Sequence, residues 1–192
     1  DQVDNRGVAV GQGLLRARAP YAGPCENHAF PDEDTLERLI SDREDCDAAV
    51  APAIRSANPE TLRSLVMYLV AYGHAAAPAD PAPRSTLPYH NAIYRADLLR
   101  ALGGRLPELM RDEGLLHVEL LRRGLRLRVR PDAVTWHVNE SRWSRAVTDP
   151  FVLGAKFGTS RGRTSTMVRR IAYALAVPAI MALRLRGLVR MA

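Results

Sequence analysis

Three groups of polar residues stand where they could take part in chemistry. Glu26-Asn27-His28 brings a carboxylate and an imidazole together, Asp112-Glu113 places two carboxylates side by side, and His137 ends the run that begins at Val134. Carboxylate oxygens and imidazole nitrogens bind divalent cations, and a carboxylate can accept a proton from a hydroxyl nucleophile. Each group also has a structural explanation: a polar loop, carboxylates favoured by a helix dipole, or a histidine that serves only the fold.

The strands expected near these residues come from two kinds of pattern. The small-residue run 48–54 predicts a buried strand, and residues 90–94 are strand-like. Leu125, Leu127 and Val129 alternate with arginines, which predicts a strand with one buried and one basic face. Since helical patterns lie between these strands, residues 1–150 are predicted to form an α/β domain.

The helix signals are caps and apolar stripes. Asp34 can cap a short helix that follows it, and Asn58-Pro59-Glu60 predicts a helix start with Asn58 as the cap. Residues 96–102 and 112–123 predict two further helices, each ended by glycine, whereas the Ala- and Pro-rich residues 74–88 predict a surface loop. The apolar residues of the first two helices are Leu36, Leu39 and Ile40, and then Leu62, Leu65, Val66, Leu69 and Val70 before Gly73.

The positive charge is concentrated at the C-terminal end. Residues 150–192 contain eight basic residues and no acidic one, whereas residues 1–149 contain 19 basic and 21 acidic residues, a net charge of −2. A nucleic-acid-binding domain spreads basic residues over its fold, so we expect no nucleic acid partner. The asymmetry favours an anionic membrane surface. Cys25 and Cys46 have no metal-ligand spacing and are expected to be free thiols in a reducing cytosol.

The C-terminal residues 151–192 predict a basic, amphipathic helical tail. Residues 171–183 form an uncharged run between Arg169-Arg170 and Arg184, and Pro178 interrupts it. Such a helix spans about 20 Å, less than the roughly 30 Å of a hydrocarbon core. We therefore expect the tail to lie at the membrane interface, with packing on the protein's own surface as the alternative.

The order of these groups resembles that of the family 2 glycosyltransferases, which have the GT-A fold. Asn5-Arg6-Gly7 is similar to the family's Asn-x-Gly helix, and Glu26-Asn27-His28 lies at the place of its Asp-x-Asp or Glu-Asp-His metal motif. Residues 87–91 with Arg95 resemble the acceptor-side segment Gly-His-Asn-x-x-x-Arg. Asp112-Glu113 resembles the Glu-Asp helix whose second acid is the catalytic base, and His137 matches a histidine that completes the metal site. The resemblance covers about residues 5–145.

The sequence also departs from the family pattern. Asn27 replaces a usual acid, Asp112-Glu113 inverts the usual order, and Tyr89 stands where Gly is common. The resemblance implies that residues 1–150 form the acceptor-side half of a GT-A domain, an incomplete mixed sheet flanked by helices. The nucleotide-binding half of the family is expected to precede Asp1, so we expect the chain alone to transfer no sugar.

The resemblance implies inverting transfer of a hexose from a nucleotide-sugar to a hydroxyl of a saccharide or lipid-linked acceptor. Glu113 or Asp112 would be the base, and Mn²⁺ or Mg²⁺ would be the cofactor. We expect a bacterial enzyme of cell-envelope or exopolysaccharide synthesis, cytoplasmic and peripheral at the inner face of the cell membrane. The remaining implied site residues are Glu26, His28 and His137 for the metal, Asn27 for the donor diphosphate, and His90, Asn91 and Arg95 for the acceptor.

Two other classes of function are compatible with the sequence. The first is a degenerate, non-catalytic glycosyltransferase-like domain that binds a saccharide or a protein partner at the membrane surface. The second is a membrane-surface scaffold in which only the tail acts. Binding of a nucleotide-sugar and a metal separates the enzyme from the first alternative, and liposome binding by the tail without any sugar chemistry favours the second.

Overall fold

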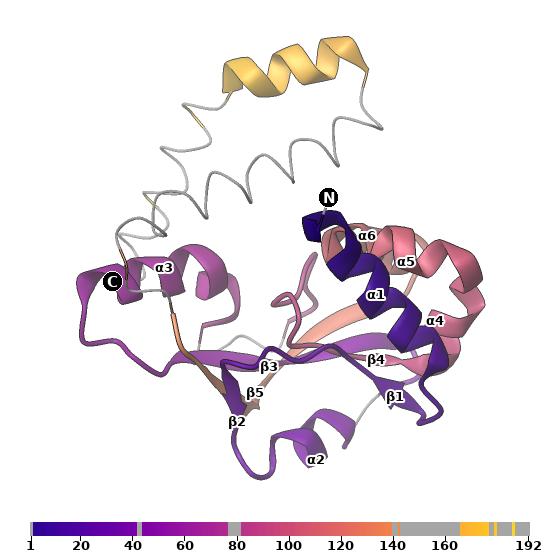
Figure 1. Cartoon of the computed structure of the whole chain (residues 1–192), viewed down its shortest axis with the longest axis horizontal. Coiled ribbons are helices and arrows are strands. Elements are labelled where there is room, and N and C mark those ends of the chain that lie inside the picture. The colour runs from indigo at the N-terminus through magenta and orange to yellow at the C-terminus, as the bar shows by residue number, and fades with distance from the viewer. Residues whose placement is uncertain are drawn as a thin grey trace.

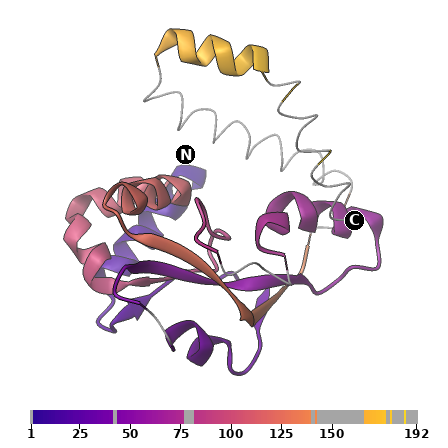
Figure 2. The same cartoon turned by 180° about the vertical axis from the view of Figure 1, so that it is seen from behind.

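The computed structural model describes residues 2–41, 44–76, 82–139, 142, 166–176, 179 and 186, with side chains from Arg6 onward. This part of the chain forms a curled, five-stranded mixed sheet with helices on both faces (Figures 1 and 2). The predicted α/β class and mixed sheet are therefore confirmed.

The sheet has the strand order β1-β4-β3-β5-β2. The central strands β3 and β5 are parallel, and the three other neighbouring pairs are antiparallel. The strands are β1 (Tyr21–Ala22), β2 (Ala29–Pro31), β3 (Asp47–Ser56), β4 (Ile93–Arg95) and β5 (Arg126–His137).

The helices divide unequally between the two faces of the sheet. In the described part of the chain α2 lies on one face, and α1 and α3 to α6 lie on the other (Figures 1 and 2). The α-helices are α1 (Gln2–Arg16), α2 (Thr35–Ile40), α3 (Leu62–Tyr72), α4 (Ala96–Leu102), α5 (Leu106–Leu109) and α6 (Glu113–Arg122), with 3-10 turns η1 (Gly73–Ala75) and η2 (Gly103–Arg105).

The core is built on β3, as the small-residue run predicts. All residues of 47–54 are buried, which is the pattern of a strand covered on both faces. Leu99, Leu116 and Leu120 pack from the helices onto the larger core cluster, whereas Leu39 of α2 packs on Val50 from the opposite side. β3 thus fixes the positions of the elements on either side of the sheet.

β5 carries the alternation predicted for residues 125–130 and continues beyond it. Leu127 and Val129 are buried, with half-buried arginines between them. After an irregularity opposite Pro52 and Ala53 of β3, the strand resumes and ends at His137. His137 pairs with Ala29 of β2, so the turn of residues 26–28 lies directly before β2 and beside the end of β5.

The glycine signals at the ends of α4 and α6 are confirmed. Gly124 follows α6 with φ 76°, and the amides of Gly124 and Leu125 donate to the carbonyls of Leu121 and Leu120. This is the Schellman arrangement, in which glycine adopts a left-handed conformation without steric cost. Asp34 lies at the N-cap position of α2, but its side chain makes no capping hydrogen bond and forms an ion pair with Arg38.

The predicted start of α3 is wrong, and most of its apolar stripe is exposed. The helix begins at Leu62, with Thr61 as its cap, because the Thr61 hydroxyl accepts from the Ser64 amide at 3.1 Å. Leu62 is 74% exposed, and Val66 and Val70 are also exposed. The buried face consists of Ser64, Tyr68 and Tyr72, whose hydroxyls bond to the domain. Side-chain hydrogen bonds therefore help to orient this helix, and of its apolar stripe Leu69 packs on the core.

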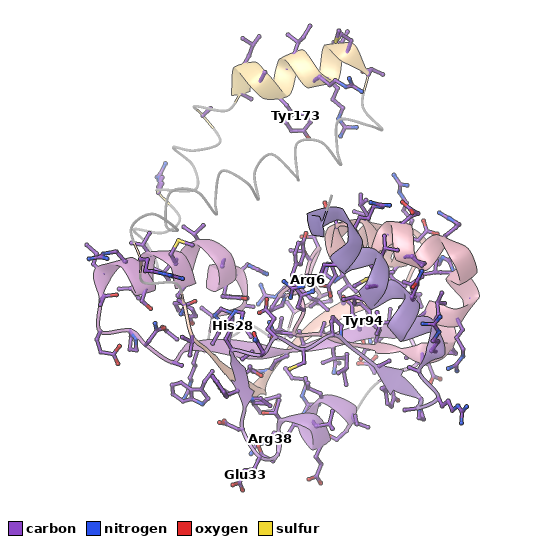
Figure 3. All side chains as sticks on the ribbon, viewed as in Figure 1. Arg6, His28, Glu33, Arg38, Tyr94 and Tyr173 are labelled. Atoms are coloured by element: carbon purple, nitrogen blue, oxygen red, sulfur yellow. The ribbon has the colours of Figure 1, made fainter. Side chains whose placement is uncertain are left out.

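The C-terminal tail is described at residues 166–176, 179 and 186. Residues 167–176 are helical, and residues 166–175 are exposed, so this segment does not pack on the protein surface. Tyr173 lies on this helix, apart from the sheet and its helices (Figure 3). Within the described residues no helix has the length and apolarity needed to cross a membrane. The remainder of the predicted interfacial run 171–183 lies outside the described residues.

Candidate functional site

Glu26, His28 and His137 form a cluster of possible metal ligands. Glu26 and His28 come from the turn before β2, and the pairing of β2 with β5 brings His137 beside them. Glu26 Oε2 lies 3.2 Å from His137 Nε2 and 4.0 Å from His28 Nε2. One ligand atom from each residue lies within 4.8 Å of the others. The three residues predicted as metal ligands are therefore brought together.

Asn139 determines which nitrogen of His137 carries the proton. The Asn139 side-chain NH₂ donates to Ser56 Oγ at 2.9 Å and to the His137 carbonyl at 3.1 Å, so Asn139 Oδ1 is left facing His137 Nδ1, also at 3.1 Å. An amide oxygen only accepts, and Nδ1 must therefore be the protonated nitrogen. In neutral His137, Nε2 then has a free lone pair directed at the cluster, which is how a second residue orients a metal-binding histidine.

Tyr72 does not supply enough protons for the contacts of this cluster. Its hydroxyl lies 3.1 Å from Glu26 Oε2 and 3.0 Å from His137 Nε2, and it has one proton to donate. Burial and the nearby Glu26 carboxylate raise the pKa of Tyr72 far above its usual range. With neutral His137, two acceptors thus face each other without a proton between them. Either a proton on Nε2 or a bound cation removes this conflict.

Glu26 is the ionised carboxylate of the site. Its burial favours the neutral acid, but the hydrogen bond and charge of His137, together with the charges of His28 and His90, outweigh burial and lower the pKa of Glu26 to about 2. Asn91 Nδ2 also donates to Glu26 Oε2 at 3.3 Å. An ionised carboxylate among imidazoles is a suitable ligand set for a divalent cation.

Glu113 is a second carboxylate with the opposite tendency. It is the first residue of α6 and is 2% exposed. Burial raises the pKa of Glu113 to about 7, although hydrogen bonds from Tyr94 and the His90 amide partly oppose this. Asp112 is the N-cap of α6 and accepts from the Gly114 amide at 3.0 Å. Two carboxylates whose pKa values are separated by their surroundings are a common feature of acid–base sites.

Residues 89–91 connect the two carboxylates. The His90 amide donates to Glu113 Oε2 at 2.7 Å, and Asn91 Nδ2 donates to Glu26. The His90 ring is 24% exposed, with Nδ1 3.4 Å from Glu113 Oε2. His90 has φ 60°, a conformation uncommon outside glycine that is often found at functional sites. Because adjacent residues hold Glu26 and Glu113, both carboxylates belong to one site.

The predicted site residues are not all part of this arrangement. Asn27 is exposed, and its Oδ1 lies 3.0 Å from His28 Nδ1. Arg95 follows the inward-facing Tyr94 on β4 and therefore points to the other face of the sheet. Its guanidinium pairs with Asp97 and donates to the Asp45 carbonyl. Arg95 is thus separate from the site formed by the other predicted residues.

Several residues of the site were not predicted from the sequence. Tyr94 bonds to Glu113 and lies 2.8 Å from His117 Nε2, and the Leu87 amide donates to His117 Nδ1 at 3.5 Å. Leu87 is buried, so the predicted surface loop enters the core at its end. A signal for His117 did exist, since it lies four residues after Glu113 on one helix face. The sequence contains no such signal for Tyr72, because its contacts with Glu26 and His137 depend on how α3 packs.

Comparison with known proteins adds no assignment, since neither any protein-family model nor any curated protein matches the chain.

Proposed function

We propose that the chain is the acceptor-side portion of a family 2 glycosyltransferase, an inverting enzyme that transfers a hexose from a nucleotide-sugar to a hydroxyl acceptor. The observation that carries this proposal is the pair of carboxylates joined by residues 89–91. One of them, Glu26, is ionised beside two imidazoles, and the other, Glu113, is buried with a raised pKa. Such a transfer needs a cation site and a proton acceptor side by side.

The sheet topology supports a GT-A-like arrangement for this portion. A short strand, β4, lies antiparallel between β1 and the central parallel pair of β3 and β5. β1 is an edge strand paired only with β4 among the described strands. In this proposal, the nucleotide-binding portion of the enzyme extends the sheet from that edge.

The ligand set fits a divalent cation. His137 Nε2 presents a lone pair, Glu26 is ionised, and the His28 side chain is 46% exposed with its Nε2 4.0 Å from Glu26 Oε2. Two imidazoles and one carboxylate suit Mn²⁺ better than Mg²⁺, which prefers oxygen ligands. When bound, the cation would stabilise the negative charge that develops on the diphosphate leaving group.

The proton acceptor in this mechanism is Glu113. The acceptor hydroxyl oxygen forms a bond to the anomeric carbon as the bond from that carbon to the diphosphate breaks, and the hydroxyl proton passes to Glu113 Oε2 on the His90 side. In this proposal the acceptor approaches from the side of the half-buried His90 ring, which lies beside Oε2. A base with a pKa near 7 is matched to neutral conditions, and general base catalysis of this kind is worth roughly 10²- to 10⁴-fold.

The proposal includes a peripheral location at the inner membrane face. Arg169 and Arg170 are exposed on the tail helix beside exposed Val168, Ile171 and Leu175. Basic and apolar residues together favour binding to an anionic lipid surface, with about 1 kcal/mol for each basic residue near the surface. A saccharide or lipid-linked acceptor would be within reach of the domain there.

Metal binding tests the site first. Titration calorimetry with Mn²⁺ should show one site, and Glu26→Gln and His137→Ala should each weaken binding at least about tenfold. His74→Ala is the matched control, because His74 lies in η1 outside the cluster. Equal Mn²⁺ affinity in all four proteins would refute the metal site.

Transfer is the second test. The purified chain should turn over no nucleotide-sugar, and fusion to the nucleotide-binding half of a related enzyme should give transfer. Glu113→Gln in the fusion should lower kcat by about 10²-fold or more. Transfer by the chain alone would contradict the proposed division of the donor site.

The non-catalytic alternative has one observation in its favour. The Glu113 side chain has no exposed surface, and both of its oxygens accept hydrogen bonds in this structure. A fusion that binds nucleotide-sugar and Mn²⁺ but transfers nothing to any saccharide would support a binding domain instead.

A further inference from the structure

Glu113 has a second set of contacts that leads away from the metal cluster. Its Oε1 accepts a hydrogen bond from the Tyr94 hydroxyl at 2.5 Å, and that hydroxyl lies 2.8 Å from His117 Nε2. His117 Nδ1 lies 3.1 Å from Thr86 Oγ1. Tyr94 and His117 are fully buried, whereas Thr86 is only half-buried. The four side chains form one line of hydrogen bonds from a buried carboxylate toward the protein surface.

When Glu113 is ionised, every contact in this line has a donor and an acceptor. Tyr94 donates to Glu113 Oε1, so the Tyr94 oxygen must accept from His117 Nε2–H. Neutral His117 then has an unprotonated Nδ1, which accepts from the Thr86 hydroxyl and from the Leu87 amide at 3.5 Å. Thus the ionised carboxylate selects the Nε2–H tautomer of His117.

When Glu113 is protonated, the donor and the acceptor exchange roles at each contact between these four side chains. Oε2 accepts from the His90 amide at 2.7 Å, so the acid proton belongs on Oε1, where it is donated to the Tyr94 oxygen. Tyr94 then donates to His117 Nε2, and His117 Nδ1–H donates to Thr86 Oγ1. Neutral Glu113 therefore selects the other tautomer, Nδ1–H, in which each contact of the path again has a donor and an acceptor, while the Leu87 amide at 3.5 Å loses its acceptor.

We propose that Tyr94, His117 and Thr86 form a proton path between Glu113 and solvent, along which His117 changes tautomer without becoming charged. The proton on Glu113 Oε1 moves to the Tyr94 oxygen as the Tyr94 proton moves to His117 Nε2. The His117 Nδ1 proton moves to Thr86 Oγ1, and the Thr86 hydroxyl proton leaves to water. The carboxylic acid becomes a carboxylate, water gains one proton, and the path ends in the arrangement found for ionised Glu113.

Burial explains why His117 stays neutral during these transfers. It lowers the pKa of His117 to about 3, and the charge of His74 adds to this effect. Burial also raises the pKa of Tyr94 well above its usual range, so Tyr94 passes protons on without remaining ionised. The titratable groups around Glu113 that set where the proton resides are Tyr94, His90, Tyr89, Asp112, Glu26, Tyr72 and His117.

The path gives the buried base a way to release its proton, and this use rests on the function proposed above. A hydroxyl acceptor delivers its proton on the Oε2 side, and rotation about the last torsion of Glu113, which is broad and two-fold, moves that proton to the Oε1 side. Tyr94, His117 and Thr86 act through Glu113 and are positioning residues. Proton release can then occur while the His90 side is covered by substrate.

Nitrogen NMR of the histidine side chains tests the path without any turnover. The chain has five histidines, and ¹⁵N labelling distinguishes the two tautomers of each ring. In a titration that spans about pH 5 to about pH 9, on both sides of the expected Glu113 midpoint near 7, His117 should change from Nδ1–H to Nε2–H. Its midpoint should coincide with that of the Glu113 carboxyl ¹³C signal. One tautomer at every pH while Glu113 titrates would overturn the path, as would an imidazolium signal.

Variants separate the path from local packing. Tyr94→Phe should uncouple His117, so that its tautomer no longer follows Glu113. Thr86→Val, at a half-buried position, should hold His117 in the Nε2–H form, because Nδ1–H then has no acceptor. Tyr68→Phe removes another buried hydroxyl, which bonds to the Ile54 carbonyl outside the path, and should leave the change of tautomer intact. A change of tautomer that persists in Tyr94→Phe or Thr86→Val would refute the proposal.

The outcomes also distinguish this proposal from the proposed function. A chain that shows the His117 change but transfers no sugar in any fusion would refute the enzyme and retain the path. A fusion that transfers sugar while His117 keeps one tautomer would retain the enzyme and refute the path. A lower kcat with unchanged KM in Tyr94→Phe, together with an altered pH profile, is the result expected when both are correct.

Discussion

Replacing Glu113 with glutamine should change how the stability of the protein depends on pH. Burial raises the pKa of Glu113 from 4.5 to about 7 in the folded chain, so the folded state binds this proton more tightly than the unfolded state. Its contribution to stability is full below about pH 4.5 and is lost as the pH rises through about 7. At about 1.4 kcal/mol for each tenfold change in proton affinity, the loss amounts to roughly 3 kcal/mol.

Glutamine is a close substitute for the protonated acid at this position. Its oxygen can accept from the His90 amide, and its NH₂ can donate to the Tyr94 oxygen. Glu113→Gln should therefore match the wild type near pH 4.5 and become more stable than it by roughly 3 kcal/mol above pH 8. Glu26 acts in the opposite sense, since its lowered pKa adds stability above pH 4.5 that is lost as the pH falls through about 2.

Urea unfolding at a series of pH values measures this difference, because the free energy of unfolding falls linearly with denaturant. The quantity to plot is the stability of Glu113→Gln minus that of the wild type, in which the other titrating groups cancel. Glu33→Gln, on the exposed loop before α2, is the matched control (Figure 3). Its free energy of unfolding should differ from that of the wild type by the same amount at every pH. If the difference in the free energy of unfolding between Glu113→Gln and the wild type stays constant from pH 4.5 to above 8, the conclusion that burial raises the pKa of Glu113 is refuted.

Three further predictions concern other parts of the structure. Asn139→Ala should weaken Mn²⁺ binding about 10- to 100-fold in calorimetry, because His137 then loses the partner that fixes its tautomer; unchanged affinity would contradict this role. Thr61→Ala should lower the free energy of unfolding in urea by about 1 kcal/mol through loss of the α3 cap, and an unchanged value would show that the cap adds nothing. Deleting residues 161–192 should abolish co-sedimentation with anionic liposomes, whereas high salt should weaken it without eliminating it; binding that survives the deletion would exclude the tail as the membrane contact.

The sheet could be predicted because its signals are local. The small residues of 48–54 and the alternation of Leu125, Leu127 and Val129 belong to single strands, and the buried faces follow from the pattern alone. The short strands β1 and β2 gave weaker signals. β2 nevertheless determines the geometry of the metal cluster, because its pairing with β5 brings the turn of residues 26–28 to His137.

The orientation of α3 could not be predicted from hydrophobic spacing. Leu62, Val66 and Val70 form an apolar stripe that is exposed, while Tyr68 and Tyr72 are buried. Burial of an apolar side chain is worth about 1.5 to 3 kcal/mol, and a hydrogen bond contributes about 1 kcal/mol net. The tyrosine rings provide both, since each buries an aromatic surface and its hydroxyl finds an acceptor. Such contacts depend on the tertiary structure, and the same reason hid the role of Tyr94.

The separation along the chain of the residues in the metal cluster has a consequence for folding. Tyr72 is 46 residues from Glu26, and His137 is 111 residues from it. Contacts between such distant segments form after the entropy of closing long loops has been overcome, which slows folding. A cation that requires both Glu26 and His137 would bind only the completed fold and would stabilise it by about 2.7 kcal/mol at a concentration 100 times its Kd. Metal binding should therefore slow unfolding of the whole domain rather than of one element, so that hydrogen exchange in α4, which contributes no residue to the cluster, reports its occupancy.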